Sequence, residues 1–490
     1  LRRRARRTIE DRFRLDRSVE AIESILKDLA APDGAAERVR TSAAPAVIAS
    51  PPPKISGPMD RWFRRGSRLV QIKHLFKPMS LAAKLRAKGK NASARVCLRL
   101  YPPYLKWIIR KSRRATAAAG PSAAPREILV VQLADLGDII LSGPALQALR
   151  AFAPEAKITL AVHPGMVDVV KACPDVDEVI PFPFRACPDW KLSFNGNFFL
   201  WRKAAALARR DFAKRRFDLA VSLRWNDDAT QAASLILAAA CGAPRLAAFL
   251  NPPDIQKLKG KHSVNRLITE GPYRGAARHE IEYQADILRS LGAEPGEPRL
   301  DVWTTPEDEK KAGELLAEAG IVSGETLVAL APGAAWEYRR WPVERFVEVG
   351  RWLQAAHRAR VLILAGKAEE ALAAEIEKGL DPARTVNLAG RTTIREMAAV
   401  LKSCRYFLGN DSGPMHVAVA AGVRVVGLFG PGDYVRFRPW GSGHAVVHLG
   451  LTCNPCSENC LFSEARCIQG ITVDMAEGAL RSVLGPERSA

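Results

Sequence analysis

The hydrophobic pattern of the chain alternates between short, continuously apolar runs and longer segments with apolar residues at helical spacing. Continuous apolar runs are typical of strands that are buried on both faces of a sheet. The first series of runs predicts strands at residues 127–133, 157–162, 179–182, 217–223 and 245–249. The segments between and after them predict helices at residues 142–152, 200–216, 229–241 and 279–291.

The alternation pauses around residues 295–306 and then resumes. The second series predicts strands at residues 327–330, 360–364, 386–388, 406–408 and 423–429. Its helices are expected at residues 306–319, 343–357, 368–378, 393–401, 415–421 and 474–484. This alternation favours α/β domains with doubly wound parallel sheets. We therefore expect two Rossmann-like domains, residues 126–298 and 299–490, that face each other across a cleft.

Residues 1–125 follow a different pattern, and we expect them to form a basic, partly disordered arm. Residues 8–29 have apolar positions at the spacing of an amphipathic helix. Residues 30–58 and 115–125 are rich in Ala and Pro, which predicts disordered or extended linkers. Residues 60–114 are basic with interleaved aromatic residues, and this composition suits an anionic membrane surface. A solvated basic tail is the alternative for this segment.

The net positive charge of the chain is concentrated in this arm. The 490 residues have a formal net charge of +21, and residues 1–126 contain 30 Lys and Arg against 9 Asp and Glu, so they carry the entire excess. The two expected domains are electrically balanced, so their charge gives no argument for nucleic-acid binding. No apolar run reaches about 18 residues, so we expect no transmembrane helix. No apolar segment follows the initial LRRRARR, so we expect no signal peptide.

Nine cysteines are scattered along the chain except for four near its C-terminal end, Cys453, Cys456, Cys460 and Cys467. The scatter fits a reducing compartment better than a disulfide framework. Four thiols this close together have the ligand type that zinc prefers, although their spacing is tighter than the usual two pairs and no histidine joins them. Structural thiols or a labile disulfide remain the alternatives.

Residues 406–431 predict a strand, a polar turn, a helix and a second strand. The turn, Gly409 to Pro414, is expected to end the first strand because Gly, Pro, Asn and Asp favour turns. Asp411 or Ser412 could cap the helix, and Pro414 suits its first turn. A helix N-terminus at the carboxyl end of a parallel strand is a site for anions, and open α/β sheets bind ligands there.

Two further stretches place polar residues at the ends of expected strands. In LADLGD, Asp138 follows the first strand, where a carboxylate facing the cleft could accept a proton from a substrate hydroxyl; the alternative is that it only caps the next helix. In APGAAWEYRRWP, Gly333 allows a ligand to approach the backbone, and Arg339 and Arg340 could contact phosphate oxygens. A surface arginine pair is the alternative. The P-loop, GxSxG and HExxH motifs are absent from the sequence.

Together these stretches resemble glycosyltransferase family 9, the heptosyltransferases of lipopolysaccharide core assembly. The segments that carry the resemblance are ILVVQLADLGDIILSGPALQALRAFAPEAKITLAVHPG, PDVDEVIPF, HEIEYQADILRSLG, APGAAWEYRRWPVERF, LGNDSGPMHVAVAAGVRVVGLFGP and the four-cysteine tail. They run from residue 128 to about residue 484. Separately, residues 8–29 are similar to the closing helix of some glycosyltransferases of family 4.

The resemblance to family 9 implies a GT-B fold and an inverting, metal-independent transfer, typically from an ADP-activated heptose to a lipid-linked acceptor. It implies that Asp138 is the general base. It also implies that the donor nucleotide-sugar is bound by Asp411, Ser412, Gly413 and His416. On electrostatic grounds, Arg339, Arg340 and the helix start from Gly413 to Met415 could stabilise the charge of the departing diphosphate without a metal. The family usually has Lys before its WP pair, where this chain has Arg339 and Arg340.

Two other readings stay open at this point. One is a nucleotide-sugar epimerase on the same architecture, which the LGD turn disfavours. The other is a non-catalytic nucleotide-sugar-binding protein that is tethered by its basic arm. The expected location is cytoplasmic, peripheral at the inner membrane through residues 60–114.

Overall fold

The structure is a computed structural model of the chain. It describes residues 46–49, 124–183, 215–224, 229–250, 267–273, 277–451, 453–456 and 464–484, together with residues 206, 210, 212 and 460. These residues all lie within one compact unit, Ala44–Ala490. The helix predicted at residues 8–29, the basic segment 60–114 and most of the helix predicted at residues 200–216 lie outside the described residues.

The N-terminal domain is built on a five-stranded sheet in the order β4-β3-β2-β5-β6, and all its neighbouring strands are parallel. The strands are β2 (Glu127–Gln132), β3 (Lys157–Val162), β4 (Glu178–Pro181), β5 (Leu219–Ser222) and β6 (Arg245–Ala247). The chain adds β3 and β4 on one side of β2, and β5 and β6 on the other. The order therefore reverses between β2 and β5, which makes this position the topological switch point of the sheet.

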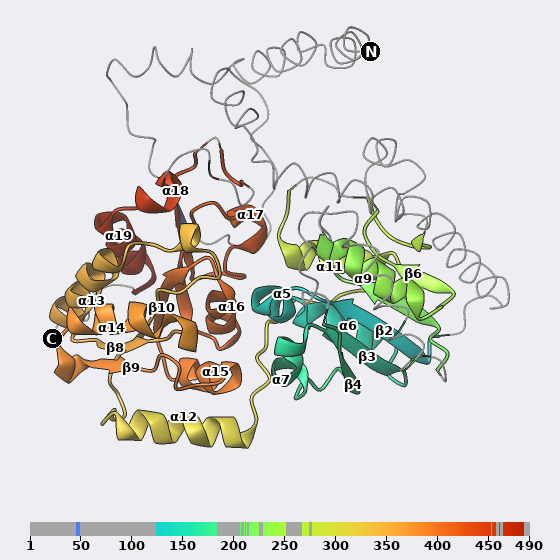
Figure 1. Ribbon diagram of the computed structural model, residues 1–490, viewed down its shortest axis with the longest axis horizontal. Coiled ribbons are helices and arrows are strands. Elements are labelled where there is room, and N and C mark those ends of the chain that lie inside the picture. Colours follow the sequence, from blue (N-terminus) through green and yellow to red (C-terminus); the bar gives the residue numbers. More distant parts are fainter. Residues whose placement is uncertain are drawn as a thin grey trace, which may run out of the picture. The chain divides into compact units, whose positions relative to one another are not determined.

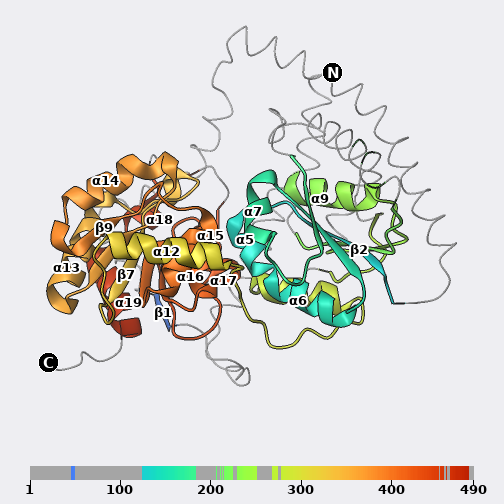
Figure 2. The same cartoon turned by 90° about the horizontal axis from the view of Figure 1, so that it is seen from below.

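Helices cover both faces of this sheet. Ile128 and Val130 of β2 belong to one core cluster, and Leu129 and Val131 belong to another, because successive side chains of a strand point to opposite faces. Figure 2 shows α6 and α9 on opposite sides of β2. The helices of this domain are α5 (Leu136–Leu141), α6 (Gly143–Phe152), α7 (Val167–Val170), α9 (Ala229–Ala240) and α11 (Glu280–Arg289).

The C-terminal domain is built on a seven-stranded sheet in the order β1-β12-β11-β10-β7-β8-β9, again with parallel neighbours. The strands are β1 (Ala46–Ala49), β7 (Leu327–Ala331), β8 (Arg360–Ile363), β9 (Thr385–Asn387), β10 (Tyr406–Asn410), β11 (Arg424–Leu428) and β12 (Ala445–His448). Strands β8 and β9 follow β7 on one side, and β10, β11 and β12 lie on the other. The switch point of this sheet lies between β7 and β10.

The helices of the C-terminal domain also form two layers (Figure 1). One face of the sheet packs against α13 (Val343–His357), α14 (Glu370–Lys378) and α19 (Val473–Leu484). The other packs against α12 (Pro306–Glu318), α15 (Ile394–Lys402) and α16 (Gly413–Ala420). The short helices are α17 (Tyr434–Phe437) and α18 (Arg466–Gln469), with 3-10 turns at Pro164–Met166, Glu337–Arg339, Lys367–Glu369 and Pro382–Arg384. The predicted α/β architecture of two doubly wound domains is confirmed.

Two local predictions around the site are wrong. Gly409 and Asn410 do not end the strand, because both continue the ladder of β10 opposite Gly427 and Leu428 of β11. The first helix of the N-terminal domain also begins earlier than the predicted residue 142, since α5 begins at Leu136. Asp138 therefore lies in the first turn of a helix rather than in a loop.

The edge of the C-terminal sheet was not predicted. Strand β12 lies beyond β11, and β1 pairs with β12 in parallel from Ala46↔Ala445 to Ala49↔His448. The sequence predicts a linker for residues 30–58, yet its short apolar run AVIA supplies a strand. A free strand edge accepts such a run because its backbone groups need partners. Among the described residues, no helix has the length and apolar character required to cross a membrane.

Candidate active site

The predicted site residues gather at the two switch points. In the N-terminal domain, α5 with Asp138 follows β2, and Arg224 follows β5. In the C-terminal domain, the loop with Gly333, Arg339 and Arg340 follows β7, and the segment from Asp411 to His416 follows β10. Ligands of open α/β sheets bind at such positions, because two loops diverge there and leave a crevice.

Asp138 forms an ion pair with Arg224, through Oδ1 and Nη1, and both side chains are nearly buried. Burial raises the pKa of the Asp138 carboxyl above its usual range, and the Arg224 guanidinium acts in the opposite direction. The main-chain carbonyl of Asp138 accepts a 2.7 Å hydrogen bond from Ser142 Oγ, which fixes the turn between α5 and α6. A carboxylate that is partly desolvated and held in one orientation is suited to accept a proton.

Arg224 was missed in the sequence analysis. It lies two residues after β5, at the carboxyl edge of the sheet, and its partner Asp138 is 86 positions away in sequence. The rule that ligands bind at this edge could have singled out a cation there. Only the strand order, which makes β2 and β5 neighbours, brings the two side chains together.

Asp411 is the centre of the C-terminal half of the site. Its Oδ2 accepts a 3.2 Å hydrogen bond from Nη1 of Arg339. Burial raises the pKa of the Asp411 carboxyl, Arg339 opposes this shift, and the negative charges of Asp433 and Asp138 add to it. Asp138 of the other domain is thus close enough to influence the ionisation of Asp411.

Arg339 and Arg340 differ in their contacts. Arg340 donates from Nε and Nη2 to the carbonyl of Ala334, at 3.0 and 2.9 Å. These two hydrogen bonds stabilise the loop that follows β7, to which both residues belong. Arg340 also lies 3.6 Å from Glu369, whose carboxylate occupies the space beside Gly333: a Cβ added there would meet it at 2.2 Å. Nε of Arg339 has no hydrogen-bond partner among the described residues. Of the two, Arg339 is therefore the better placed to contact a ligand.

The start of α16 offers backbone rather than side-chain groups. Ser412 is the N-cap residue, but its Oγ donates to the carbonyl of Asn410 at 3.2 Å instead of capping the helix. Met415 is fully buried in the core, and its N–H donates to the carbonyl of Ser412 at 3.1 Å. Any contact of this turn with an anion would therefore come from Ser412 and Gly413, at the positive end of the helix dipole.

Helices α5 and α16 pack directly against each other and join the two halves of the site (Figures 1 and 2). A Cβ on Gly137 would lie 2.7 Å from Cδ2 of His416, and a Cβ on Gly413 would lie 2.9 Å from Leu136. Burial lowers the pKa of His416 to about 4, so its imidazole is neutral at neutral pH. Its Nδ1 has no hydrogen-bond partner among the described residues.

Asn410 fixes the two loops of the C-terminal switch point to each other, a role that was not assigned from the sequence. Its Nδ2 donates to the carbonyl of Pro332 at 2.7 Å, and its Oδ1 accepts from the N–H of Trp341 at 3.0 Å. Trp341 is buried against Phe346. The Arg339 loop therefore has a rigid support on both of its sides.

The cysteine tail lies beside the loop that follows β11. Asn454 Nδ2 donates to the carbonyl of Gly430 at 2.7 Å, and the N–H of Cys456 donates to the carbonyl of Pro431 at 3.1 Å. Burial raises the pKa of the Cys467 thiol to about 11, and the neighbouring Cys456 and Cys453 contribute. Within the part of the chain that the structure describes, no three Cys, His, Asp or Glu side chains are grouped to hold a metal ion.

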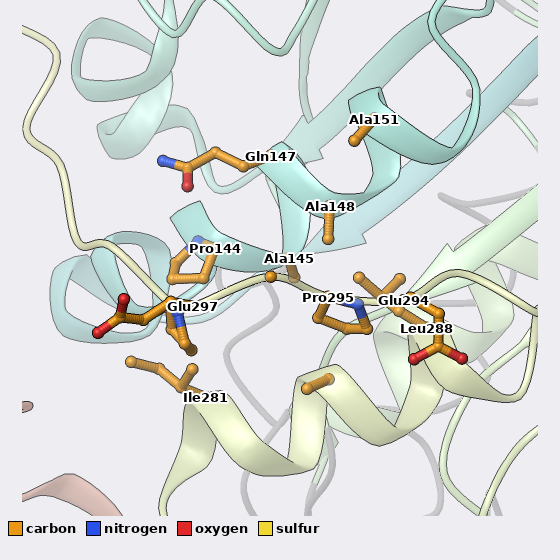
Figure 3. Close-up of a pocket in the computed structure, with 13 residues that line it drawn as sticks. Pro144, Ala145, Gln147, Ala148, Ala151, Ile281, Leu288, Glu294, Pro295 and Glu297 are labelled. Carbon is orange, nitrogen blue, oxygen red and sulfur yellow. The ribbon is translucent and has the colours of Figure 1, made fainter. Parts of the chain in front are cut away.

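A cavity of about 190 Å³ lies in the N-terminal domain between α6, α11 and residues 294–298. Figure 3 shows Ala145 and Ala148 of α6 on one side of it, Ile281 and Leu288 of α11 on the other, and two glutamates at its edges. None of the predicted site residues lines this cavity. We therefore place the candidate site at the switch points and not here.

Comparison with known proteins agrees with this architecture. The profile of Glycosyltransferase family 9 (heptosyltransferase) matches residues 278–465. The chain is 33% identical over 157 residues to lipooligosaccharide heptosyltransferase 2 of Campylobacter jejuni, a match that covers 31% of this chain and 49% of that protein. It is 25% identical over 309 residues to lipopolysaccharide heptosyltransferase 3 of Escherichia coli, covering 62% of this chain and 83% of that protein.

Solved structures give the same result for the fold. A family 9 glycosyltransferase from Veillonella parvula superposes with a TM-score of 0.58 at 22% identity, covering 73% of this chain and 97% of that one. E. coli ADP-heptose lps heptosyltransferase II superposes with a TM-score of 0.53 at 20% identity, covering 73% and 98%. The GT-B fold predicted from the sequence is confirmed.

The chain is thus heptosyltransferase-like, and its recognition as similar to glycosyltransferase family 9 is confirmed. The matched region spans about half the length of the first two curated relatives, 49% and 53%. The roles of the individual site residues stay predictions, and they enter the proposal below.

Proposed function

We propose that the chain is an inverting, metal-independent glycosyltransferase that moves heptose from ADP-heptose to a lipopolysaccharide core or a related lipid-linked acceptor. In this proposal residues 126–298 form the acceptor domain and residues 299–490 the donor domain. Asp138 is the general base, and Arg339, Asp411 and the start of α16 hold the donor. Arg340 and Gly333 shape the donor loop, and His416 closes the site toward α5.

One observation carries the proposal, namely the packing of α5 on α16. This packing brings the buried carboxylate of Asp138 in one domain close to the start of α16 and to the Asp411–Arg339 pair in the other. Displacement at an anomeric carbon needs the acceptor hydroxyl and the leaving group on opposite faces of the sugar. Two domains that contribute one polar cluster each meet that requirement.

The proposed reaction is a single displacement. The acceptor oxygen forms a bond to the anomeric carbon while Asp138 takes its proton, and the bond from that carbon to the diphosphate oxygen breaks, so ADP leaves with the bonding electron pair. Arg224 favours the ionised form of Asp138 before the reaction. The Arg339 guanidinium and the dipole of α16 stabilise the charge that develops on the diphosphate.

The choice of donor rests on the relatives. The solved E. coli relatives are described as an ADP-heptose lps heptosyltransferase and as heptosyltransferase WaaC with ADP. The curated relatives are named for heptose transfer to lipopolysaccharide or lipooligosaccharide. These names support an ADP-heptose donor and a lipid-linked saccharide acceptor for this chain.

The experiment that tests the proposal is a mass-spectrometric transfer assay with a panel of ADP-, GDP- and UDP-sugars, with and without a heptose-accepting lipopolysaccharide core. We expect product only from the ADP-sugar and only with acceptor. An altered donor sugar in the absence of acceptor would indicate the epimerase reading. Nucleotide-sugar binding without any product would indicate a non-catalytic binding protein.

We also propose that the basic segment 60–114 holds the enzyme at the cytoplasmic face of the inner membrane, where lipid-linked acceptors are exposed. Clusters of Lys and Arg with aromatic residues bind anionic lipid surfaces, and salt screens this attraction. The full chain should sediment with phosphatidylglycerol vesicles at low salt and much less at high salt. Equal sedimentation after deletion of residues 1–120 would refute this role of the arm.

A further inference from the structure

A buried ion pair between two residues not considered so far connects the two domains. Glu280 is the first residue of α11 in the N-terminal domain, and Arg436 belongs to α17 in the C-terminal domain. Nε of Arg436 donates to Oε2 of Glu280, and the two side chains are 6% and 0% exposed. The position of Glu280 is favourable in itself, because a negative charge in the first turn of a helix interacts with its dipole.

The neighbours of this pair make the same connection. His279, the N-cap of α11, accepts at Nδ1 from the N–H of Ile281, so its proton is on Nε2, which donates to the carbonyl of Arg438 at 2.9 Å. The Trp440 ring packs against the His279 ring, with the ring centroids 4.7 Å apart and the planes tilted by 48°, and its Nε1 donates to the carbonyl of Pro298 at 3.3 Å. Segment 436–440 therefore contacts the N-terminal domain through an ion pair and two hydrogen bonds.

The pair is linked to both halves of the active site. On the donor side, Asp433 caps α17 by accepting from the N–H of Arg436 at 3.2 Å. The preceding Gly432 lies so close to Asp411 that an added Cβ would be 1.9 Å from its Oδ2. On the acceptor side, both Glu280 and Arg436 influence the ionisation of Asp138, in opposite directions.

The free energy of a buried ion pair indicates that the Glu280–Arg436 pair fixes the orientation of the two elements more than it adds stability. A buried ion pair adds little net stability compared with well-packed apolar residues, because both charges lose their hydration. Separating the two charges in a dry interface is strongly unfavourable, since each would be left buried without its partner. Such a pair therefore permits few relative orientations of the elements that carry it.

We infer that Glu280 and Arg436 are positioning residues that hold the segment 430–440 against α11, so that Asp138 faces the donor sugar. This inference rests on the proposed function. The pair touches neither substrate in this view and acts through the relative placement of the base and the donor site.

The test compares Glu280→Gln, Arg436→Gln and the double variant with the full wild-type chain. Because the proposed function places ADP on the C-terminal domain, its Kd should change less than about threefold. The kcat of transfer should fall about a hundredfold, and the double variant should lose little more than either single variant. Arg289→Gln, which removes an exposed cation from the same helix, is the matched control and should transfer at the wild-type rate.

A measurement without turnover separates this inference from the proposed function. Hydrogen–deuterium exchange should be faster in α5 and in segment 433–440 of the Glu280→Gln variant, and unchanged in α13 and α14. Arg436→Lys keeps the charge and should recover part of the kcat, which provides a readout if the neutral variants fold poorly. Unchanged exchange together with an unchanged kcat would overturn the inference. Lack of transfer by the wild-type chain, with the exchange difference present, would overturn the proposed function alone.

Discussion

The two switch points carry the same kind of ion pair in different surroundings. In the N-terminal domain the acid follows the first strand and the arginine follows the later one, and both partners, Asp138 and Arg224, are only 13% and 12% exposed. In the C-terminal domain the order is reversed. Asp411 is 7% exposed there, while its partner Arg339 is 34% exposed, and within the described part of the chain the Nε of Arg339 has no hydrogen-bond partner.

This difference assigns different chemistry to equivalent positions. Where the cation is buried with its acid, the pair controls the ionisation of a carboxylate, as a general base requires. Where the acid is buried and the cation reaches outward, the carboxylate orients a guanidinium that can still bind an anion. In the proposed mechanism, the Asp138–Arg224 pair therefore prepares the carboxylate that accepts the proton, and the Asp411–Arg339 pair binds the diphosphate.

The largest expected effect comes from removing the base. Asp138→Asn keeps the shape of the side chain but cannot accept the acceptor proton, so kcat should fall by about 10²–10⁴-fold while the Kd for ADP stays near wild type. Transfer kinetics and calorimetry measure the two quantities. Asp135→Asn, an exposed acid in the same turn, is the control and should transfer normally. Near-normal turnover of Asp138→Asn would refute the proposed role of the base.

The next effect concerns the arginine of the donor side. Arg339→Gln removes a charged donor from the diphosphate, and we expect the Kd for ADP to rise about ten- to hundredfold, since such hydrogen bonds contribute about 1.5–3 kcal/mol. Arg340→Gln should instead lower the melting temperature, because this side chain holds the carbonyl of Ala334. Calorimetry and thermal unfolding of both variants check the assignment. Equal effects of the two substitutions on ADP affinity would contradict it.

A smaller and pH-dependent effect is expected for the arginine of the acceptor side. Arg224→Gln removes the charge that lowers the pKa of Asp138, so burial should raise this pKa further. The base must be ionised to act, and the acid limb of the kcat/KM profile should therefore move to higher pH. At pH 7 we expect about tenfold lower activity that recovers as the pH is raised. A loss that is the same at every pH would show that Arg224 acts in some other way.

The smallest effect concerns stability and compares one histidine from each domain. Burial lowers the pKa of His279 to about 3 and that of His416 to about 4, whereas both would be near 6.5 in the unfolded chain. The unfolded state therefore binds protons first as the pH falls, so stability is lost from about pH 6.5 down to about pH 4 for His416 and about pH 3 for His279. At pH 5.5 each histidine should lower the free energy of unfolding by about 1 kcal/mol relative to neutral pH.

Urea unfolding at pH 7.0 and 5.5 measures this loss, and His416→Leu and His279→Leu should each reduce it. His279→Leu should also lower the stability at pH 7.0, because His279 bonds to both Ile281 and Arg438. His416→Leu should not, since its Nδ1 has no partner among the described residues. An unchanged pH dependence in both variants would show that other groups dominate the acid sensitivity.

The fold was largely predictable from the hydrophobic pattern, and the site only in part. The strands of both series, and those of their helices that the structure describes, were predicted within a few residues, because their apolar periods are local properties of the chain. The motif residues were found because they directly follow strands. The sequence could not predict that Arg339 and Arg340 make different contacts, or that Met415 is buried in the core. Each of these contacts depends on the direction in which a loop folds back.

The sequence by itself determined two doubly wound sheets, the polar stretches at their carboxyl ends and the likeness to glycosyltransferase family 9. The tertiary structure alone decided the pairing of Arg224 with Asp138 across 86 positions, of Arg339 with Asp411 across 72, and of Arg436 with Glu280 across 156. It also decided that residues 46–49 join the C-terminal sheet. The physical reason is that strand order and domain packing bring distant segments together, whereas periodicity and turn chemistry act only over a few residues.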